Sequence, residues 1–273
     1  MLLFLEMIPY MVIFIFGIVI GSFLNVCIYR MPLHESIITA PSHCMTCGGK
    51  LHWYDMVPVF SWLCLRGRCR NCGTKISVQY PVIEALNGVL YVVVFAVNGL
   101  NSVSGLYCLM ASALLTLSLI DWRTYEIPLP INGFLFVLGI VATGLDSAHI
   151  LSHVIGALCV SLVLELIFII SGGRAIGGGD VKILAVTVMY AGLRLWFSFF
   201  FFSLILAGVG GLFRILLSGT FRIRIQYFSE YIRTGGLRRG HPYEGPEREQ
   251  AELPFLPFLF LGALLGCWWG GVL

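Results

Sequence analysis

The sequence predicts an all-α polytopic membrane protein with about eight transmembrane helices and a small domain between the first two. Of its 273 residues, 58% are hydrophobic and 11% are charged, whereas roughly 25% of residues are charged in a typical soluble domain. Long stretches almost free of charge recur along the chain, each close to the ~20 residues that cross a bilayer. Basic residues collect in alternate connections between these stretches, as in a protein that crosses a membrane repeatedly.

The apolar stretches give the expected helices in chain order. They cover residues 7–29, 79–97, 103–120, 128–146, 150–171, 181–195, 197–217 and 254–272. The first follows Glu6 and ends before Arg30, so it lacks the basic start and small-residue cleavage site of a signal peptide. Residues 181–217 form one apolar block that is interrupted at Gly192. We expect two short helices there; the alternative is one long kinked helix and seven spans.

Charge placement predicts the orientation, because Lys and Arg collect in cytoplasmic loops. With eight spans and both termini outside, 16 of the 17 basic residues face the cytoplasm, and Arg194 is the exception. The same orientation places Asp121 and Asp180 on the cytoplasmic face. These are two of only four aspartates in the chain.

The segment 30–78, between the first two expected helices, carries two Cys-x-x-Cys pairs. They are Cys44 with Cys47 and Cys69 with Cys72, separated by 21 residues. Each pair aims two thiolates at one point, and two such pairs complete a tetrahedral zinc site. The alternative is a pair of disulfides, which are rare in the cytoplasm. We therefore expect a cytoplasmic zinc-binding domain, in which the metal supplies folding free energy to a segment with little core.

Asp121 ends one apolar stretch in "LTLSLIDWRTYEIPLP", and Asp180 opens another in "GGGDVKIL". A carboxylate at membrane depth costs about 2.5–3.5 kcal/mol, so such a group is a functional candidate. Taken singly, Asp121 could pair with Arg123, and Asp180 could stabilise the start of its helix. Together on one face they favour a functional pair. Two carboxyl groups that share a proton can activate a water and polarise a carbonyl, which is aspartyl-protease chemistry.

Three further features belong to the candidate site. Gly177, Gly178 and Gly179 would allow close backbone approach and unusual torsions beside Asp180, as an extended peptide substrate needs; the alternative is a flexible hinge with no substrate role. Lys182 is expected at the membrane interface, where it would favour the ionised aspartate. Glu84 either orients the zinc domain, contacts a substrate amine or is an interfacial carboxylate.

Two other classes of protein remain open from the residues alone. A transporter could use Asp121, Asp180 and Glu165 as a proton or cation relay, although no internal repeat is visible in the sequence. A non-catalytic assembly subunit would explain the cysteines but not the paired aspartates.

The second polar segment, 218–253, is interpreted as a cytoplasmic loop attracted to anionic lipid, with a short strand or interfacial segment at its start.

Several blocks resemble the type IV prepilin peptidases, which are bacterial membrane aspartyl proteases of the GxGD type. They are "GSFLNVCIYRMP" (21–32), the four-cysteine segment, "IDWRTYEIP" (120–128), "GGGDVKILA" (177–185) and "LPFLPFLFLGALLG" (253–266). The order of the blocks predicts a first helix (1–29), a zinc domain (30–78) and a peptidase core (79–273). The chain departs from the family pattern at Met45 and at Leu129-Pro130.

The resemblance implies that Asp121 and Asp180 are the catalytic pair and that the four cysteines bind structural zinc. It implies prepilin and pseudopilin substrates with a short basic leader and a glycine before the cut. Cleavage would occur at the cytoplasmic face of a bacterial inner membrane. Membrane lipid and, indirectly, a pilus or secretion machine are the other expected partners, and no nucleic acid is expected. Many members also methylate the new N-terminus with S-adenosylmethionine, for which the sequence shows no recognisable binding loop.

Overall fold

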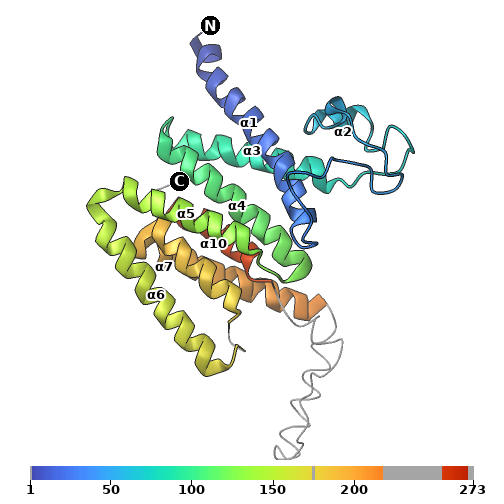
Figure 1. Cartoon of the computed structure of the whole chain (residues 1–273). Helices are drawn as coiled ribbons and strands as arrows, with labels where there is room; N and C mark the ends of the chain where they lie inside the picture. Colours follow the sequence, from blue (N-terminus) through green and yellow to red (C-terminus); the bar gives the residue numbers. More distant parts are fainter. Residues whose placement is uncertain (1, 174–175, 218–253, 270–273) are drawn as a thin grey trace, which may run out of the picture.

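A computed structural model of the chain describes residues 2–173, 176–217 and 254–269. These residues form helices and connecting turns, with no β-strand among them. The long helices are α1 (Leu2–Arg30), α3 (Gln79–Asn98), α4 (Ser102–Thr124), α5 (Leu129–Leu145), α6 (Ile150–Ser171), α7 (Gly178–Leu217) and α10 (Leu256–Trp269). A polar segment with the short helix α2 (Phe60–Cys64) projects from the bundle beside α1 and α3 (Figure 1). The expected all-α architecture is therefore confirmed.

Four helices are long and apolar enough to cross a membrane, namely Glu6–Arg30, Gln79–Asn98, Ser102–Thr124 and Ser147–Ser171. Three shorter apolar helices lie among the described residues: Leu129–Leu145, Trp196–Gly210 and Leu256–Leu265. These findings indicate a multi-pass membrane protein, and the count of eight crossings stays a prediction. The expected cytoplasmic loop 218–253, with its short strand, lies outside the described residues.

Helices α1, α3 and α4 are joined by close backbone approach and buried amides. A Cβ atom on Gly17 of α1 would lie 2.8 Å from the Cα of Gly88 in α3. Beside this contact the Asn87 side chain donates to the Gly17 carbonyl at 2.7 Å and accepts from the Ser112 hydroxyl of α4 at 2.8 Å. Small residues and interhelical hydrogen bonds replace the hydrophobic effect between helices in lipid. The bundle is thus fixed where α1, α3 and α4 meet.

Helix α7 breaks at Gly192, where the backbone has φ 63° and ψ 165°. The indole N–H of Trp196 donates to the Leu184 carbonyl at 3.1 Å, although 12 residues of straight helix would separate them by about 18 Å. The chain therefore turns back on itself, which supports two helices within 181–217 rather than one. At the break, the Met189 carbonyl accepts a hydrogen bond from the His153 ring at 3.0 Å.

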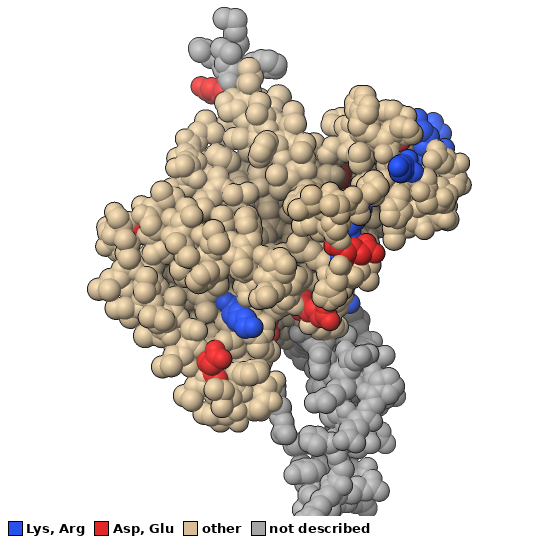
Figure 2. All heavy atoms as spheres, in the orientation of Figure 1, with Lys and Arg blue, Asp and Glu red and all other residues tan. Residues whose placement is uncertain are grey.

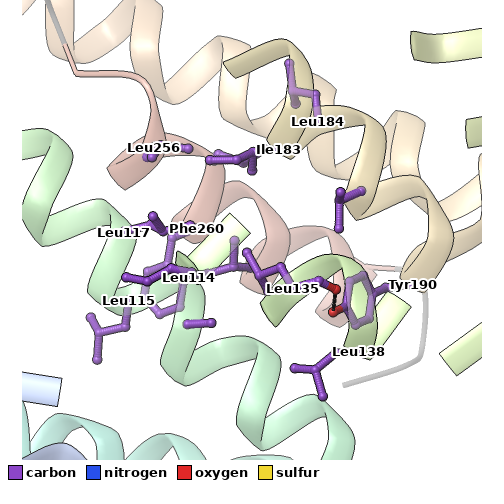
Figure 3. Packing of buried hydrophobic residues seen from close by; sticks show 14 of the residues in the cluster. Leu114, Leu115, Leu117, Leu135, Leu138, Ile183, Leu184, Tyr190, Leu256 and Phe260 are labelled. Atoms are coloured by element: carbon purple, nitrogen blue, oxygen red, sulfur yellow. Dashed lines mark hydrogen bonds between the residues drawn. The ribbon is translucent and has the colours of Figure 1, made fainter. Parts of the chain in front are cut away.

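The innermost core lies where α4, α5, α7 and α10 meet (Figure 3). Its buried side chains include Leu114, Leu117, Leu135, Leu138, Ile183, Leu184, Leu256 and Phe260. Leu117 and Ile183 have no exposed surface; Leu117 lies one turn before Asp121, and Ile183 lies one turn after Asp180. Packing of this core therefore fixes both segments that carry the candidate carboxylates.

Candidate active site and metal centre

Asp121 lies in the last turn of α4, with its side chain buried (6% exposed). Its Oδ2 accepts a hydrogen bond from the backbone N–H of Leu256, the first residue of α10, at 3.0 Å. Ser118, one turn earlier on the same face of α4, donates to the Leu256 carbonyl at 3.2 Å. The first N–H groups of a helix have no partner within the helix. Here α4 supplies one, and the contact holds the Asp121 carboxyl group in place.

Asp180 lies in the first turn of α7, three residues after Gly177. The Gly177 carbonyl accepts the first helical hydrogen bond, from the Val181 N–H at 3.2 Å. In return, the Asp180 carboxylate accepts a hydrogen bond from the Gly177 N–H. This reciprocal pattern is half of a capping box, in which the third helical residue reaches back to the residue before the helix. Asp180 is therefore both a helix-stabilising carboxylate and a candidate reactive group.

The structure brings the two aspartates to the same end of the bundle, close enough for their carboxyl groups to interact electrostatically. Each carboxyl group also contacts the start of a helix, α10 for Asp121 and α7 for Asp180. The positive end of the helix dipole favours negative charge at both places. The pair carries one negative charge when one of its two carboxyl groups is ionised. The N-termini of α7 and α10 both stabilise this charge.

The glycines beside Asp180 differ from the expectation. None of Gly177, Gly178 and Gly179 has a positive φ, and the last two already belong to α7. The expectation of unusual torsions at these positions is therefore wrong. Their absent side chains matter instead, because a Cβ on Gly179 would lie 2.5 Å from Cδ1 of Ile127, in the connection that follows Asp121. Glycine at position 179 lets the two aspartate segments approach each other.

Neighbouring charged residues do not neutralise the pair. Arg123 donates to the Tyr29 hydroxyl at 3.2 Å and to Gln79 Oε1 at 3.1 Å, so the alternative in which it pairs with Asp121 is not seen. Lys182 is exposed, and residues two apart on a helix do not face each other. No ion pair joins Lys182 to Asp180 in the described part of the chain.

Glu165, the third member of the alternative proton relay, is exposed on α6. A relay needs its groups to face a common interior path. The position of Glu165 on the outer surface of the bundle therefore removes it from any such path with Asp121 and Asp180.

Glu84 is buried (6% exposed) in α3 and contacts the four-cysteine segment 30–78, which is called the zinc domain after its predicted metal. Its Oε2 accepts a hydrogen bond from the Val59 N–H at 2.7 Å, and the Ser22 hydroxyl of α1 also bonds to the carboxyl group. Val59 has a φ of 62°, which is uncommon for a β-branched residue. Of the three roles expected for Glu84, the contacts favour orientation of the zinc domain.

The four cysteines converge as their spacing predicts. One sulfur from each of Cys44, Cys47, Cys69 and Cys72 lies within 4.8 Å of all the others, and the Cys44 and Cys72 sulfurs are 3.8 Å apart. A tetrahedral zinc site with Zn–S bonds near 2.3 Å places its sulfurs about 3.8 Å apart. The arrangement fits one tetrahedral metal ion and not two disulfides. Four thiolates would close the coordination sphere, so the metal would have a structural role.

Local backbone geometry explains the two cysteine turns. In the first, the Cys44 carbonyl accepts from the Gly48 N–H at 2.9 Å; in the second, the Cys69 carbonyl accepts from the Gly73 N–H at 2.9 Å. Both glycines have positive φ, 68° and 71°, which glycine adopts without strain. Hydrogen bonding between Cys72 and the side chain and backbone of Thr74 lowers the pKa of the Cys72 thiol to about 6, which favours the thiolate that binds metal.

An ion pair stabilises the zinc domain beside the cluster. Arg70 Nε lies 2.8 Å from Asp55 Oδ1, and only 5% of the Asp55 side chain is exposed. The His52 N–H donates to the other Asp55 oxygen at 3.3 Å. Burial opposes ionisation of Asp55, but the hydrogen bonds from Arg70 and His52 outweigh it and lower the pKa of this carboxyl group.

The sequence did not indicate the contribution of Leu256 and Ser118 to the site. Ser118 precedes Asp121 by three residues, so their shared helix face was readable in "LSLID". The position of α10 against that face was not, because the contact joins residues 135 positions apart. Pro254 and Pro257 mark the start of the last helix but say nothing about its neighbour.

Two family models match the chain. The Bacterial Peptidase A24 N-terminal domain matches residues 15–97, and the Type IV leader peptidase family matches residues 108–212. The first range contains Glu84 and all four clustered cysteines, and the second contains Asp121 and Asp180. No solved structure matches the chain.

Several curated proteins named prepilin leader peptidase/N-methyltransferase are similar. One from Myxococcus xanthus is 31% identical over 212 residues, which cover 76% of this chain and 63% of that protein. One from Bacillus subtilis is 29% identical over 266 residues, which cover 95% and 94%. One from Dickeya chrysanthemi is 33% identical over 211 residues, which cover 64% and 72%. The match thus spans less than two thirds of the Myxococcus protein but nearly all of the Bacillus protein.

Proposed function

Because the chain belongs to the type IV leader peptidase family, we propose that it is a membrane aspartyl endopeptidase with Asp121 and Asp180 as its catalytic pair. The observation that carries this proposal is that the carboxyl groups of α4 and α7 lie close enough, at one end of the bundle, to interact electrostatically. Neither carboxyl group is paired with a base among the described residues. They are therefore free to exchange a proton with each other and with a substrate.

The mechanism follows from the repulsion between like charges. Two neighbouring carboxylates cannot both ionise cheaply, so the pair retains one proton. The ionised member removes a proton from a water, whose oxygen attacks the scissile carbonyl carbon, while the protonated member donates to the carbonyl oxygen. When the tetrahedral intermediate collapses, the C–N bond breaks, and the carboxyl group that took the water proton passes it to the leaving amine nitrogen. The Leu256 N–H holds Asp121, and the Gly177 N–H holds Asp180. Each hydrogen bond fixes one carboxyl oxygen and leaves the other available for this exchange.

We propose that the substrates are prepilins or pseudopilins, cut after a glycine at the cytoplasmic membrane face. The relatives' names and the positive-inside orientation support this assignment. A cut site at the junction of a polar leader and an apolar helix would lie at the same depth as carboxyl groups carried at helix ends. The zinc site, Cys44, Cys47, Cys69 and Cys72, would stabilise the cytoplasmic domain and take no part in hydrolysis.

We further propose that the new N-terminal amine is methylated with S-adenosylmethionine. Support comes from the N-methyltransferase in the relatives' names. S-adenosylmethionine would supply the methyl group, and the chain's own task would be to hold the freed amine unprotonated beside it. The family's pilus or secretion machinery would then receive the mature subunit.

The test is mass spectrometry of a prepilin incubated with the purified full chain, with and without S-adenosylmethionine. The variants are Asp121→Asn and Asp180→Asn, with Asp146→Asn as a matched control, because Asp146 pairs with His149 and His153 instead. Loss of the leader is expected with wild type and Asp146→Asn. Each catalytic variant is expected to slow cleavage by about 10²–10⁴-fold, the usual contribution of general acid–base catalysis.

Other outcomes would contradict the proposal at separate points. Cleavage at the wild-type rate in both Asp121→Asn and Asp180→Asn would remove the aspartate pair from the mechanism. A folded wild type that cuts none of several prepilins would favour a transporter or an assembly subunit. Cleavage without an added methyl group in the presence of S-adenosylmethionine would reject the methyltransferase alone.

A further inference from the structure

The zinc domain exposes apolar side chains in a segment that no candidate membrane span contains. Within residues 53–63, six large apolar side chains are between 39% and 77% exposed: Trp53, Tyr54, Met56, Val57, Phe60 and Leu63. A concentrated apolar surface outside the spans marks an interaction site. The binding partner of this surface can be inferred from its depth relative to the membrane, from the side of the domain that it faces and from the charge around it.

A hydrogen bond to α3 indicates how deep this segment lies relative to the membrane. The Val59 N–H donates to Glu84 at 2.7 Å, and Glu84 lies five residues after Gln79, where α3 begins. Five residues of helix correspond to about 7.5 Å. Residues next to Val59 therefore lie beside the first turns of a membrane-spanning helix and not beyond its end. With α3 entering the membrane at its first turns, as the expected span 79–97 has it, this is the depth of the lipid headgroups.

The contacts of Trp62 show which side of the segment faces the interior of the zinc domain. Its indole N–H donates to the Ile76 carbonyl at 3.2 Å, and its ring fills the space that a Cβ on Gly67 would need. Trp62 thus faces the interior of the zinc domain. Phe60 and Leu63, three residues apart on α2, share a helix face and are 62% and 58% exposed. One side of the segment holds the zinc domain together, and the other is free.

The charge of the domain identifies the partner. Residues 31–78 contain five basic residues and two acidic ones, a net charge of +3, and basic side chains gather at the outer part of this domain (Figure 2). Lys and Arg side chains near an anionic bilayer surface are attracted to it electrostatically. A basic leader peptide would be repelled by the same charges. An anionic lipid surface therefore fits better than a substrate.

We propose that residues 53–63 anchor the zinc domain in the cytoplasmic headgroup layer of an anionic phospholipid bilayer. Trp53, Phe60 and Leu63 enter the boundary between headgroups and acyl chains, and the arginines and lysines remain among the phosphates. Aromatic and aliphatic residues with flanking basic residues are the composition of interfacial membrane anchors. The anchor and the Glu84 contact together hold the zinc site against the membrane surface. This inference does not depend on the proposed peptidase activity.

The test uses the full chain labelled with 5-fluorotryptophan and placed in nanodiscs of phosphatidylcholine, with or without phosphatidylglycerol. Trp53→Phe assigns the Trp53 signal among the six tryptophans. A lipid with a spin label near its headgroup is expected to remove most of the Trp53 signal, and a water-soluble gadolinium chelate is expected to leave it. Trp62, in the same domain but facing inward, is the internal control and should lose less signal to the spin-labelled lipid.

Three results would overturn the proposal. The first is a Trp53 signal that the soluble chelate removes and the labelled lipid spares. The second is protection that is equal in neutral and anionic nanodiscs, which would reject the anionic lipid. The third is a Trp53 signal that stays accessible to the chelate until a prepilin is added, which would assign the surface to a substrate. The double variant Phe60→Ser/Leu63→Ser is expected to expose Trp53 to the chelate while the Trp62 signal keeps its position.

Discussion

The backbone N–H of Leu256 donates a hydrogen bond to Oδ2 of Asp121, although the two residues lie 135 positions apart. The contact joins the end of α4 to the start of α10 and lies within the buried core. It gives the last helix a direct role in holding one member of the candidate catalytic pair. The charge of Asp121 and the dipole of α10 support each other through this bond.

Removing this N–H should impair catalysis more than it impairs folding. Leu256→Pro deletes the donor at the first helical position, where proline is well tolerated, and Leu256→Ala is the control that keeps the donor but also loses the leucine side chain. A hydrogen bond to a charged group contributes about 1.5–3 kcal/mol, so Leu256→Pro should cleave roughly 10–100-fold more slowly than Leu256→Ala. Equal rates for the two variants would show that the bond does not support catalysis.

Gly179→Ala should push the two aspartate segments apart. Its Cβ would lie 2.5 Å from Ile127 Cδ1, and overpacking of this kind costs about 1–3 kcal/mol. We expect a lower melting temperature and slower prepilin cleavage, both partly restored by adding Ile127→Ala. Gly133→Ala is the control, since a Cβ there meets nothing within 4 Å. A Gly179→Ala protein with wild-type stability and rate would contradict the close-approach explanation.

Metal removal should unfold the zinc domain locally. Cys69→Ser removes one of the four thiolates, while Cys64→Ser removes an exposed thiol outside the cluster. Elemental analysis should find one zinc per chain in wild type and Cys64→Ser and far less in Cys69→Ser. Chelation of wild type should make residues 30–78 sensitive to a protease. Unchanged protease resistance after complete loss of zinc would rule out a folding role for the metal.

The stability of the zinc domain should depend on Asp55 in a pH-dependent way. Because hydrogen bonds from Arg70 and His52 lower the pKa of Asp55 in the folded state, its stabilising contribution is fully present above the ordinary aspartate pKa of about 3.9. The contribution is lost as the pH falls through the lowered folded value. Hydrogen exchange of wild type and Asp55→Asn should therefore differ at neutral pH and converge in acid. The exposed Glu35→Gln serves as the control, and a difference that grows in acid would contradict this sign.

Glu84→Ala should release the zinc domain from α3. The change leaves the Val59 N–H without its acceptor, and a buried hydrogen bond contributes about 1 kcal/mol. Exchange of the Val59 amide hydrogen should speed up several-fold, while Glu84→Gln, which keeps an acceptor oxygen, should remain close to wild type. If Glu84→Ala leaves this amide as protected as in wild type, Glu84 does not orient the domain.

The sequence by itself determined those features that depend on composition and short spacing. Apolar stretches long enough to cross a bilayer predicted the helices. Each Cys-x-x-Cys pair with its glycine predicted a turn, because the geometry of such a turn depends only on neighbouring residues. The interruption at Gly192 likewise marked the break in α7, because a residue in that conformation cannot continue a helix. Asp121 and Asp180 could be picked out as candidate functional residues because carboxylates are costly at membrane depth.

Only the tertiary structure decided which helix faces meet. A helix that is apolar on all sides does not show which face meets protein and which meets lipid. The contacts of Asp121 with Leu256 and of Glu84 with Val59 therefore had no counterpart in the sequence pattern. The same reason explains why the sequence did not reveal the close approach of Gly179 to Ile127, which lies in the connection after α4. The spacing of residues along the chain does not show which distant segment packs against a glycine.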